Sequence, residues 1–168
     1  KGHLDCLEVR KAIFFAFNLQ SLIDLNGGLE FYGQPGDSPI APSVALDYAP
    51  TTGNIHDSNY KITGNPDYAK QLLDTAKSKC PAAYTKATKT GITFDLAKSA
   101  TNEKAATLIK SAMDAAGIVA KFNLIEPGVY YPTVQNPAKQ GDISRAGWGA
   151  DWANASTVIP PIFIHDPS

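Results

Sequence analysis

Two hydrophobic repeats follow one another in the middle of the chain. Residues 65–79 carry apolar side chains three and four positions apart, behind Asn65-Pro66-Asp67, which suits a helix cap followed by a first turn. Residues 91–97 then alternate apolar and polar positions, the period of a strand. The pattern predicts a helix that ends near Cys80, a turn rich in Lys and Thr, and a short strand.

The next stretch repeats this order. Asn102 is expected to open a helix whose apolar face runs to Ala116, and Gly117 suits a left-handed cap at its end. Residues 118–125 alternate again, with an apolar side that ends in Leu124. A strand, a helix and a strand with tight connections favour a parallel, right-handed crossover, so the predicted fold class is α/β.

The outer parts of the chain are less regular. Leu7 to Leu25 predicts one largely buried helix that Gly27-Gly28 stops, and Phe31 to Gly64 predicts a long, ordered loop. Pro127 to Lys139 is a helix candidate that prolines interrupt, and Asp142 to Trp148 is a candidate for a further strand.

Length and charge narrow the function classes. The 168 residues suit one domain, and a net charge of −1 with basic residues spread along the chain argues against nucleic-acid binding. The longest apolar run, near Ala12 to Phe17, is shorter than the roughly 20 residues that a membrane span needs. No signal peptide is visible at Lys1-Gly2-His3, so we expect the sequence to start inside a longer protein.

Catalytic and metal-binding patterns are not found in the sequence. The histidines, His3, His56 and His165, lie far apart without a neighbouring ligand, and there is no G-x-S-x-G, so no enzyme activity, metal or cofactor is predicted. Cys6 and Cys80 lack metal-ligand spacing, which leaves two free thiols or one disulfide. The segment Gly33 to Asp37 lacks the lysine of a phosphate-binding loop and is interpreted as a turn.

Four segments resemble a known family. Residues 9–18 are similar to the helix V-R-x-A-[IL]-x-x-A-x-D, and residues 67–76 to the helix A-K-x-L-L-x-x-A, of the family 5 extracellular solute-binding proteins. Ala116-Gly117-Ile118 and the following strand match a helix that runs into G-I-x-V-x-L, and residues 147–152 resemble G-W-x-x-D-[YW]. This family contains the oligopeptide-, dipeptide- and nickel-binding components of ABC importers.

The resemblance carries expectations about architecture and partners. It implies that residues 1–168 form a single α/β lobe like those of periplasmic binding proteins, with a mixed, mostly parallel sheet flanked by helices. Such a chain would be the C-terminal ligand-binding lobe of a two-lobed protein whose partner lobe is absent. The whole protein is expected to be a monomer outside the cytoplasm, periplasmic or on the cell surface, lipid-anchored, and to deliver peptides or similar solutes to an ABC permease and ATPase.

The resemblance also names site residues. Asp151 stands where peptide-binding members pair an aspartate with the ligand's terminal ammonium, and Trp148 and Trp152 beside it could form flat apolar walls. Tyr32 and Tyr130 are further aromatic candidates. Two simpler interpretations stay open: Trp148 could be a core residue on a strand, and Asp151 could only cap a turn.

Departures from the family pattern leave the solute open. Asn18-Leu19 stands where Asp-Arg is common, and Asn154-Ala155 where Asp-Pro is common. The alternatives are therefore a binder of a sugar, an opine or a chelated metal such as nickel, or an unrelated α/β hydrolase.

Overall fold

The computed structural model describes residues 2–33, 35–36, 38–44, 47–49 and 54–163, with the side chains of residues 2, 3 and 54 left aside. Contacts within the chain divide it into two compact units, which are described separately. Unit 1 comprises Lys1–Gly33 and Ser58–Arg145, and unit 2 comprises Gln34–Asp57 and Ala146–Ser168. The single lobe expected over residues 1–168 stays a prediction.

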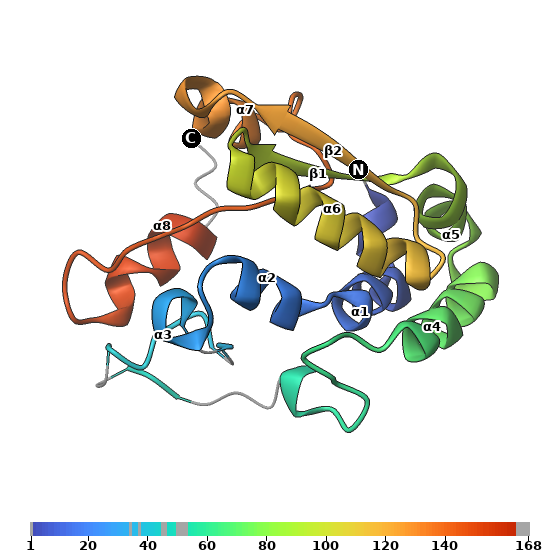
Figure 1. The fold of residues 1–168 in the computed structure, drawn as a ribbon, viewed down its shortest axis with the longest axis horizontal. Helices are drawn as coiled ribbons and strands as arrows, with labels where there is room; N and C mark the ends of the chain where they lie inside the picture. The colour runs from blue at the N-terminus through green and yellow to red at the C-terminus, as the bar shows by residue number, and fades with distance from the viewer. Residues whose placement is uncertain (1, 34, 37, 45–46, 50–53, 164–168) are drawn as a thin grey trace. The chain divides into compact units, whose positions relative to one another are not determined.

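Unit 1 is built around a three-stranded parallel sheet. The strands are β1 (Ile92–Ala97), β2 (Ala120–Ile125) and β3 (Ile143–Ser144), in the order β2-β1-β3. Helix α6 (Ala100–Ala115) connects β1 to β2 and lies across the two strands (Figure 1). The α/β class is confirmed, since two parallel neighbours joined through a helix are the defining unit of such folds.

The connection between β1 and β2 starts earlier than predicted. Helix α6 begins at Ala100, two residues before Asn102, because the Ser99 side chain caps it by accepting the backbone N–H of Asn102 at 3.1 Å. Gly117 has φ +78°, the left-handed conformation expected of it. Leu124, on the predicted apolar side of β2, is 39% exposed because β2 is an edge strand of the sheet.

Helix α4 (Pro66–Lys79) confirms the first helical repeat. The Asn65 side chain caps it by accepting the N–H of Tyr68, and Ala69, Leu73 and Ala76 are buried. The turn predicted after it is wrong: α5 (Pro81–Thr85) and a π-helical turn, η3 (Lys86–Thr90), occupy the segment. Pro81 suits the first turn of a helix, so it starts a new one where the sequence suggested only a stop.

The long helix predicted over residues 7–25 is wrong as one element. It is two helices, α1 (Leu7–Ala16) and α2 (Leu19–Leu25), separated by extended Phe17 and by Asn18. The Asn18 side chain caps α2 by accepting the N–H of Ser21 at 3.0 Å. Asn side chains can bind nearby backbone in this way, which competes with a continuous helix through position 18. The predicted stop is confirmed, because Gly27 and Gly28 both have positive φ.

Smaller elements fill the remaining segments. The predicted loop 31–64 includes the end of α3 (Leu29–Tyr32) and a short helix, η2 (Asn54–His56), while its residues 34, 37, 45–46 and 50–53 lie outside the described part. The helix predicted over residues 127–139 is reduced to η4 (Pro127–Val129) and α7 (Tyr130–Val134). The last predicted strand is wrong beyond the two residues of β3.

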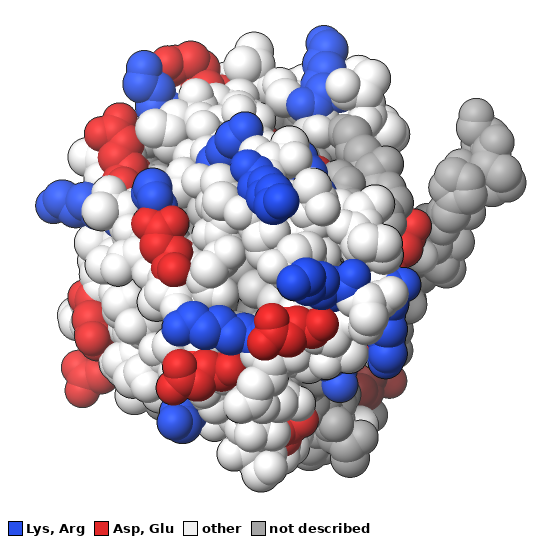
Figure 2. All heavy atoms as spheres, turned by 90° about the vertical axis from the view of Figure 1, so that its right-hand side faces the viewer, with Lys and Arg blue, Asp and Glu red and all other residues white. Residues whose placement is uncertain are grey.

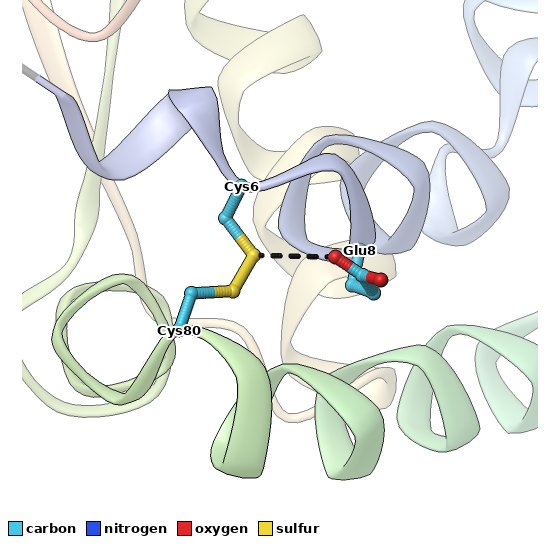
Figure 3. Close-up of side chains that lie close together, drawn as sticks. All are labelled: Cys6, Glu8 and Cys80. Atoms are coloured by element: carbon cyan, nitrogen blue, oxygen red, sulfur yellow. Dashed lines mark hydrogen bonds between the residues drawn. A yellow bond between two sulfur atoms is a disulfide. The ribbon is translucent and has the colours of Figure 1, made fainter.

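Unit 1 is held by one core and one disulfide. Buried side chains from α1, α2, α4, α5, β1, α6 and β2 form a single cluster. Cys6, before α1, and Cys80, between α4 and α5, form a disulfide with a Cα–Cα distance of 6.3 Å (Figure 3). Of the two states left open for these cysteines, the structure therefore has the bridged one.

Unit 2 has a smaller core. Ile40, Val44 and Val158 are buried together. Its C-terminal segment contains η5 (Ala155–Thr157) and α8 (Ile159–Phe163), and the N–H of Ala155 donates to Asp47 at 2.7 Å. Across the described ranges, no helix has the length and apolar character that crossing a bilayer requires.

Charges of both signs are mixed on one face of the molecule. Lys and Arg side chains lie among Asp and Glu side chains on the face seen in Figure 2. Ion pairs join some of the charged side chains of the described residues, such as Lys98 with Glu126 at 2.8 Å and Lys110 with Asp114 at 2.6 Å. This face offers no broad patch of one sign for a polyanion.

Candidate functional site

The predicted site residues Trp148, Asp151 and Trp152 come together in unit 2. They lie on an irregular segment that follows Arg145 and precedes η5, and all three side chains are exposed. The interpretation of Trp148 as a core residue on a strand is wrong, because β3 ends at Ser144 and Trp148 is 54% exposed. Trp152 is 56% exposed.

Thr157 holds this segment in place. It is fully buried, and its carbonyl oxygen accepts the indole N–H of Trp148 at 2.6 Å. Its hydroxyl oxygen accepts the backbone N–H of Asp151 at 2.9 Å. One buried residue therefore fixes the ring of Trp148 and the backbone that carries the Asp151 carboxylate.

A second set of contacts shapes the turn after Trp152. The Asn154 side chain accepts the N–H of Ser156 at 2.9 Å, and the N–H of Thr157 donates to the Asn154 carbonyl. The indole N–H of Trp152 donates to the Ser156 hydroxyl at 3.1 Å. Asn154, which departs from the family pattern, here makes the turn that Asp or Asn side chains commonly make.

The Asp151 carboxylate is available to a ligand. The backbone of Asp151 is tied to Thr157, but no described residue donates a hydrogen bond or forms an ion pair with its side chain. The carboxylate therefore does not cap a turn within the described part of the chain. An exposed anion without a partner gains most from a cationic group that arrives with a ligand.

A pocket of about 470 Å³ lies within unit 2 beside this segment. Trp148, Gly149 and Ala150 line one part of it, and Val44 and Phe163 are among the apolar residues that line the rest. This volume is within the range of about 300 to 1,000 Å³ typical of small-molecule sites. Asp151 follows the lining residue Ala150 in the chain.

The two predicted tyrosines belong to unit 1 and differ in exposure. Tyr32, the last residue of α3, is 38% exposed and lines a cavity of about 270 Å³ together with Asn26 and Arg145. Tyr130 is 4% exposed, and its hydroxyl donates to the carbonyl oxygens of Asp95 and Arg145. Burial, with the nearby negative charge of Asp95, raises the pKa of Tyr130, so the phenol stays protonated and keeps donating.

Asp95 is a polar residue that the sequence pattern did not single out. It is fully buried in the central strand, and its carboxylate accepts from the Asn123 side chain at 2.8 Å, the Ser144 hydroxyl at 2.9 Å and the N–H of Gly141. These bonds tie β1 to β2 and to the start of β3. A period-two pattern assigns Asp95 to a polar face, and only the parallel neighbours on both sides reveal its burial.

Among the described residues, one group of potential metal ligands lies close together, and it contains the disulfide. Cys6, Glu8 and Cys80 lie close together, but both sulfurs are used by the disulfide (Figure 3). Glu8 instead accepts a hydrogen bond from Lys79 at 2.7 Å, and this contact lowers the pKa of Glu8. His56 lies on η2, the side chain of His3 is not described, and His165 is outside the described residues.

Comparison with known proteins gives one family. The model of "Bacterial extracellular solute-binding proteins, family 5 Middle" matches residues 1–168, the whole chain. No curated protein sequence matches the chain.

Proposed function

Because this chain belongs to family 5 of the bacterial extracellular solute-binding proteins, we propose that it binds short peptides through Asp151, Trp148 and Trp152. The coarse assignment follows from membership: it is part of an extracytoplasmic solute-binding component of an ABC importer, a binder rather than an enzyme. The peptide, and the roles of these three residues, are the proposal.

The Asp151 carboxylate, which has no partner among the described residues, is the observation that supports the proposal. A peptide with a free amino terminus brings an ammonium group, which can pair with this carboxylate through charge-assisted hydrogen bonds. Because Thr157 fixes the backbone of Asp151, little conformational freedom of that backbone is lost when the pair forms.

The two tryptophans offer flat apolar surfaces that can contact ligand side chains of different shapes. Each indole N–H is already bound within unit 2, Trp148 to Thr157 and Trp152 to Ser156, so the rings keep exposed apolar surface in fixed positions. Rigid aromatic surfaces contribute area at low entropic cost and tolerate varied side chains. This combination suits a binder that recognises the charged end of a peptide more strictly than its sequence.

Closure against a second lobe would complete the site. In two-lobed binding proteins, hinge closure buries the ligand, and a membrane transporter recognises the closed form. Burial strengthens the pair between Asp151 and the ammonium, since an unpaired carboxylate in a closed cleft is costly. We propose that the whole protein is a lipid-anchored monomer, periplasmic or on the cell surface, acting with an ABC permease and ATPase.

The test uses the full two-lobed protein and calorimetric titration with a free-amine tripeptide. Asp151→Asn keeps the shape of the side chain and removes its charge, and we expect affinity to fall about 30-fold or more. Asp67→Asn, an exposed aspartate on α4, is the matched control and should leave affinity unchanged.

An N-acetylated tripeptide separates the ammonium from the rest of the ligand. It should bind the unaltered protein about as weakly as the free peptide binds the Asp151→Asn variant. Equal affinity of both peptides for the unaltered protein would refute the pairing. Native mass spectrometry that finds a sugar or a metal chelate carried through purification would favour a non-peptide solute.

A further inference from the structure

Three side chains with metal-ligating atoms lie together near the start of α1. The sulfurs of Cys6 and Cys80 and a carboxylate oxygen of Glu8 all lie within 4.8 Å of one another (Figure 3). The Cys6 sulfur is 3.6 Å from Oε2 of Glu8. In the bridged protein the two sulfurs are bonded to each other, so this group contains no thiolate to bind a metal ion.

The reduced form of this group is a state through which every molecule passes. Cysteines are synthesised as thiols, so Cys6 and Cys80 remain thiols until the bridge forms. A dithiol reductant regenerates this state by thiol–disulfide exchange. One of its thiolates attacks a sulfur of the bridge, and its second thiol then attacks the mixed disulfide. Both cysteines are released as thiols, and the reductant leaves as a disulfide.

Helix packing keeps the three ligands close without the bridge. Glu8 lies in the first turn of α1, two residues after Cys6, and Cys80 is the residue that ends α4. Next to these positions, Val9 of α1 and Ala76 of α4 are fully buried in the same core cluster. We therefore expect both sulfurs and the carboxylate to stay near one another after reduction.

The distances suit a tetrahedral zinc ion. With Zn–S bonds of about 2.3 Å and Zn–O bonds of about 2.0 Å, a sulfur and an oxygen ligand lie about 3.5 Å apart, and two sulfurs about 3.8 Å apart. The distance of 3.6 Å between the Cys6 sulfur and Glu8 matches the first value. The Cα atoms of the two cysteines are 6.3 Å apart, so rotation of their side chains is enough to reach the second.

Lys79 supports the same arrangement. Its Nζ donates to Oε1 of Glu8 at 2.7 Å, while Oε2 faces the Cys6 sulfur. A ligating carboxylate that is itself hydrogen-bonded is typical of metal sites, because the outer partner fixes its orientation. A divalent ion together with Lys79 balances the charges of two thiolates and Glu8. The Glu8 side chain is 17% exposed, which leaves solvent a way to the group.

We propose that the reduced protein binds one zinc ion through Cys6, Glu8 and Cys80, with water as the fourth ligand. The ion and the disulfide are then alternative links between the start of α1 and the end of α4. Thiolate ligands select zinc over magnesium and calcium. Binding releases the two thiol protons to the solvent and transfers no electron. The site belongs to unit 1 and does not depend on the proposed peptide site.

The first experiment counts the zinc bound in each redox state. The full two-lobed protein is reduced with a dithiol, freed of reductant without oxygen, and titrated with Zn²⁺ against a chromophoric chelator. Reduced protein should bind one more zinc per chain than the Cys6→Ser, Cys80→Ser double variant, with a Kd of about 1 μM or below. Oxidised protein should bind no more zinc than the double variant. Equal zinc content of the reduced protein and the double variant would overturn the proposal.

A substitution of Glu8 tests whether the folded site is the one that binds. Loss of an outer partner alone weakens metal sites about 10-fold or more, so Glu8→Gln should weaken zinc binding by at least that factor. Asp5→Asn, at an exposed acid next to Cys6, is the matched control and should leave the affinity unchanged. Equal affinity of Glu8→Gln and the unaltered protein would also overturn the proposal, because two thiols of an unfolded chain would bind zinc without Glu8.

The rate of reoxidation gives an independent measurement. Zinc-bound thiolates are shielded from exchange, so excess Zn²⁺ should slow closure of the bridge by a small-molecule disulfide about 10-fold or more. A chelator should restore the original rate, and Mg²⁺ in place of Zn²⁺ should have no effect. A rate of thiol loss that is the same with and without zinc would contradict the proposed site.

Discussion

The two units of this chain are stabilised differently. Unit 1 combines a large apolar core with a disulfide and a buried carboxylate that links its three strands. Unit 2 has a small core of Ile40, Val44 and Val158, and its exposed segment is held by a few hydrogen bonds, two of them to Thr157. The proposed ligand contacts lie on the segment held by a few polar bonds, which is where a binding site can be altered without disturbing a large core.

The disulfide gives the largest expected effect. Cys6 and Cys80 are 74 residues apart in sequence, and a crosslink over a loop of this length stabilises the folded state by about 4 kcal/mol in the chain-entropy account. Cys6→Ser with Cys80→Ser should lower the free energy of unfolding by about that amount, measured by denaturant titration. Circular dichroism, which reports mainly on the helices of unit 1, should show the shift.

Reduced unaltered protein is the control for the serine substitutions and should match them. Both tryptophans of the chain belong to unit 2, so their fluorescence follows that unit. We expect the disulfide to stabilise unit 1 more than unit 2. If the unfolding midpoints measured by fluorescence and by circular dichroism shifted equally, this expectation would be contradicted.

The Asp95 network is expected to rank second. Asp95→Asn replaces one acceptor oxygen with a donor, so two donors then face each other near Gly141 and Ser144. We expect a loss of about 2 to 3 kcal/mol, because hydrogen bonds to a buried charged group are strong and unmade ones are costly. The measurement is chemical denaturation, and Asp114→Asn on the exposed face of α6 is the control that should change stability little. A loss below about 0.5 kcal/mol would show that the network is not a main support of the sheet.

Thr157 should give the smallest and most local effect. Thr157→Val keeps the shape but removes the hydroxyl that accepts the Asp151 N–H, at a cost of about 1 to 2 kcal/mol confined to unit 2. Tryptophan fluorescence should change and the dichroism of unit 1 should not. Thr157→Ser keeps the hydroxyl and should restore the fluorescence, whereas a serine variant that behaves like valine would assign the effect to lost packing.

The regular elements of unit 1 could be predicted from the sequence because each carries a local signal. Asn65 before Pro66 marks the start of α4, the alternation after Gly91 marks β1, and Gly117 marks the end of α6. Such signals depend on neighbouring residues alone. They are kept in the folded chain because the apolar faces that they predict are the faces buried in the core.

The sequence prediction failed where two local choices compete. Phe17 and Asn18 are compatible with a continuous helix, and the cap made by Asn18 broke it into α1 and α2. A turn was predicted after Cys80, although the proline at position 81 suits the first turn of a new helix. Both outcomes depend on how the flanking segments pack in the folded protein. A short stretch of sequence does not contain this information.

The roles of the predicted site residues stay a prediction, and only their positions are now known. The resemblance pointed to Trp148, Asp151 and Trp152, and the structure places all three exposed on one segment. The resemblance did not point to Thr157, whose role depends on contacts with residues six and nine positions away. It also did not point to the pocket of unit 2, which is built from residues within 39–44 and 148–163. Contacts of this kind follow from the folded backbone, so residue type alone does not predict them.

The bridge between Cys6 and Cys80 also sets an order of events during biogenesis. Cys6 emerges from the ribosome long before its partner, so the start of α1 is crosslinked only after α2, α3 and α4 have been synthesised. Within these 168 residues there are two cysteines and hence one internal pairing, which needs an oxidant and no shuffling by an isomerase. Maturation of this part of the protein therefore depends on the redox poise of the compartment that receives it, and reductant added during export should delay it.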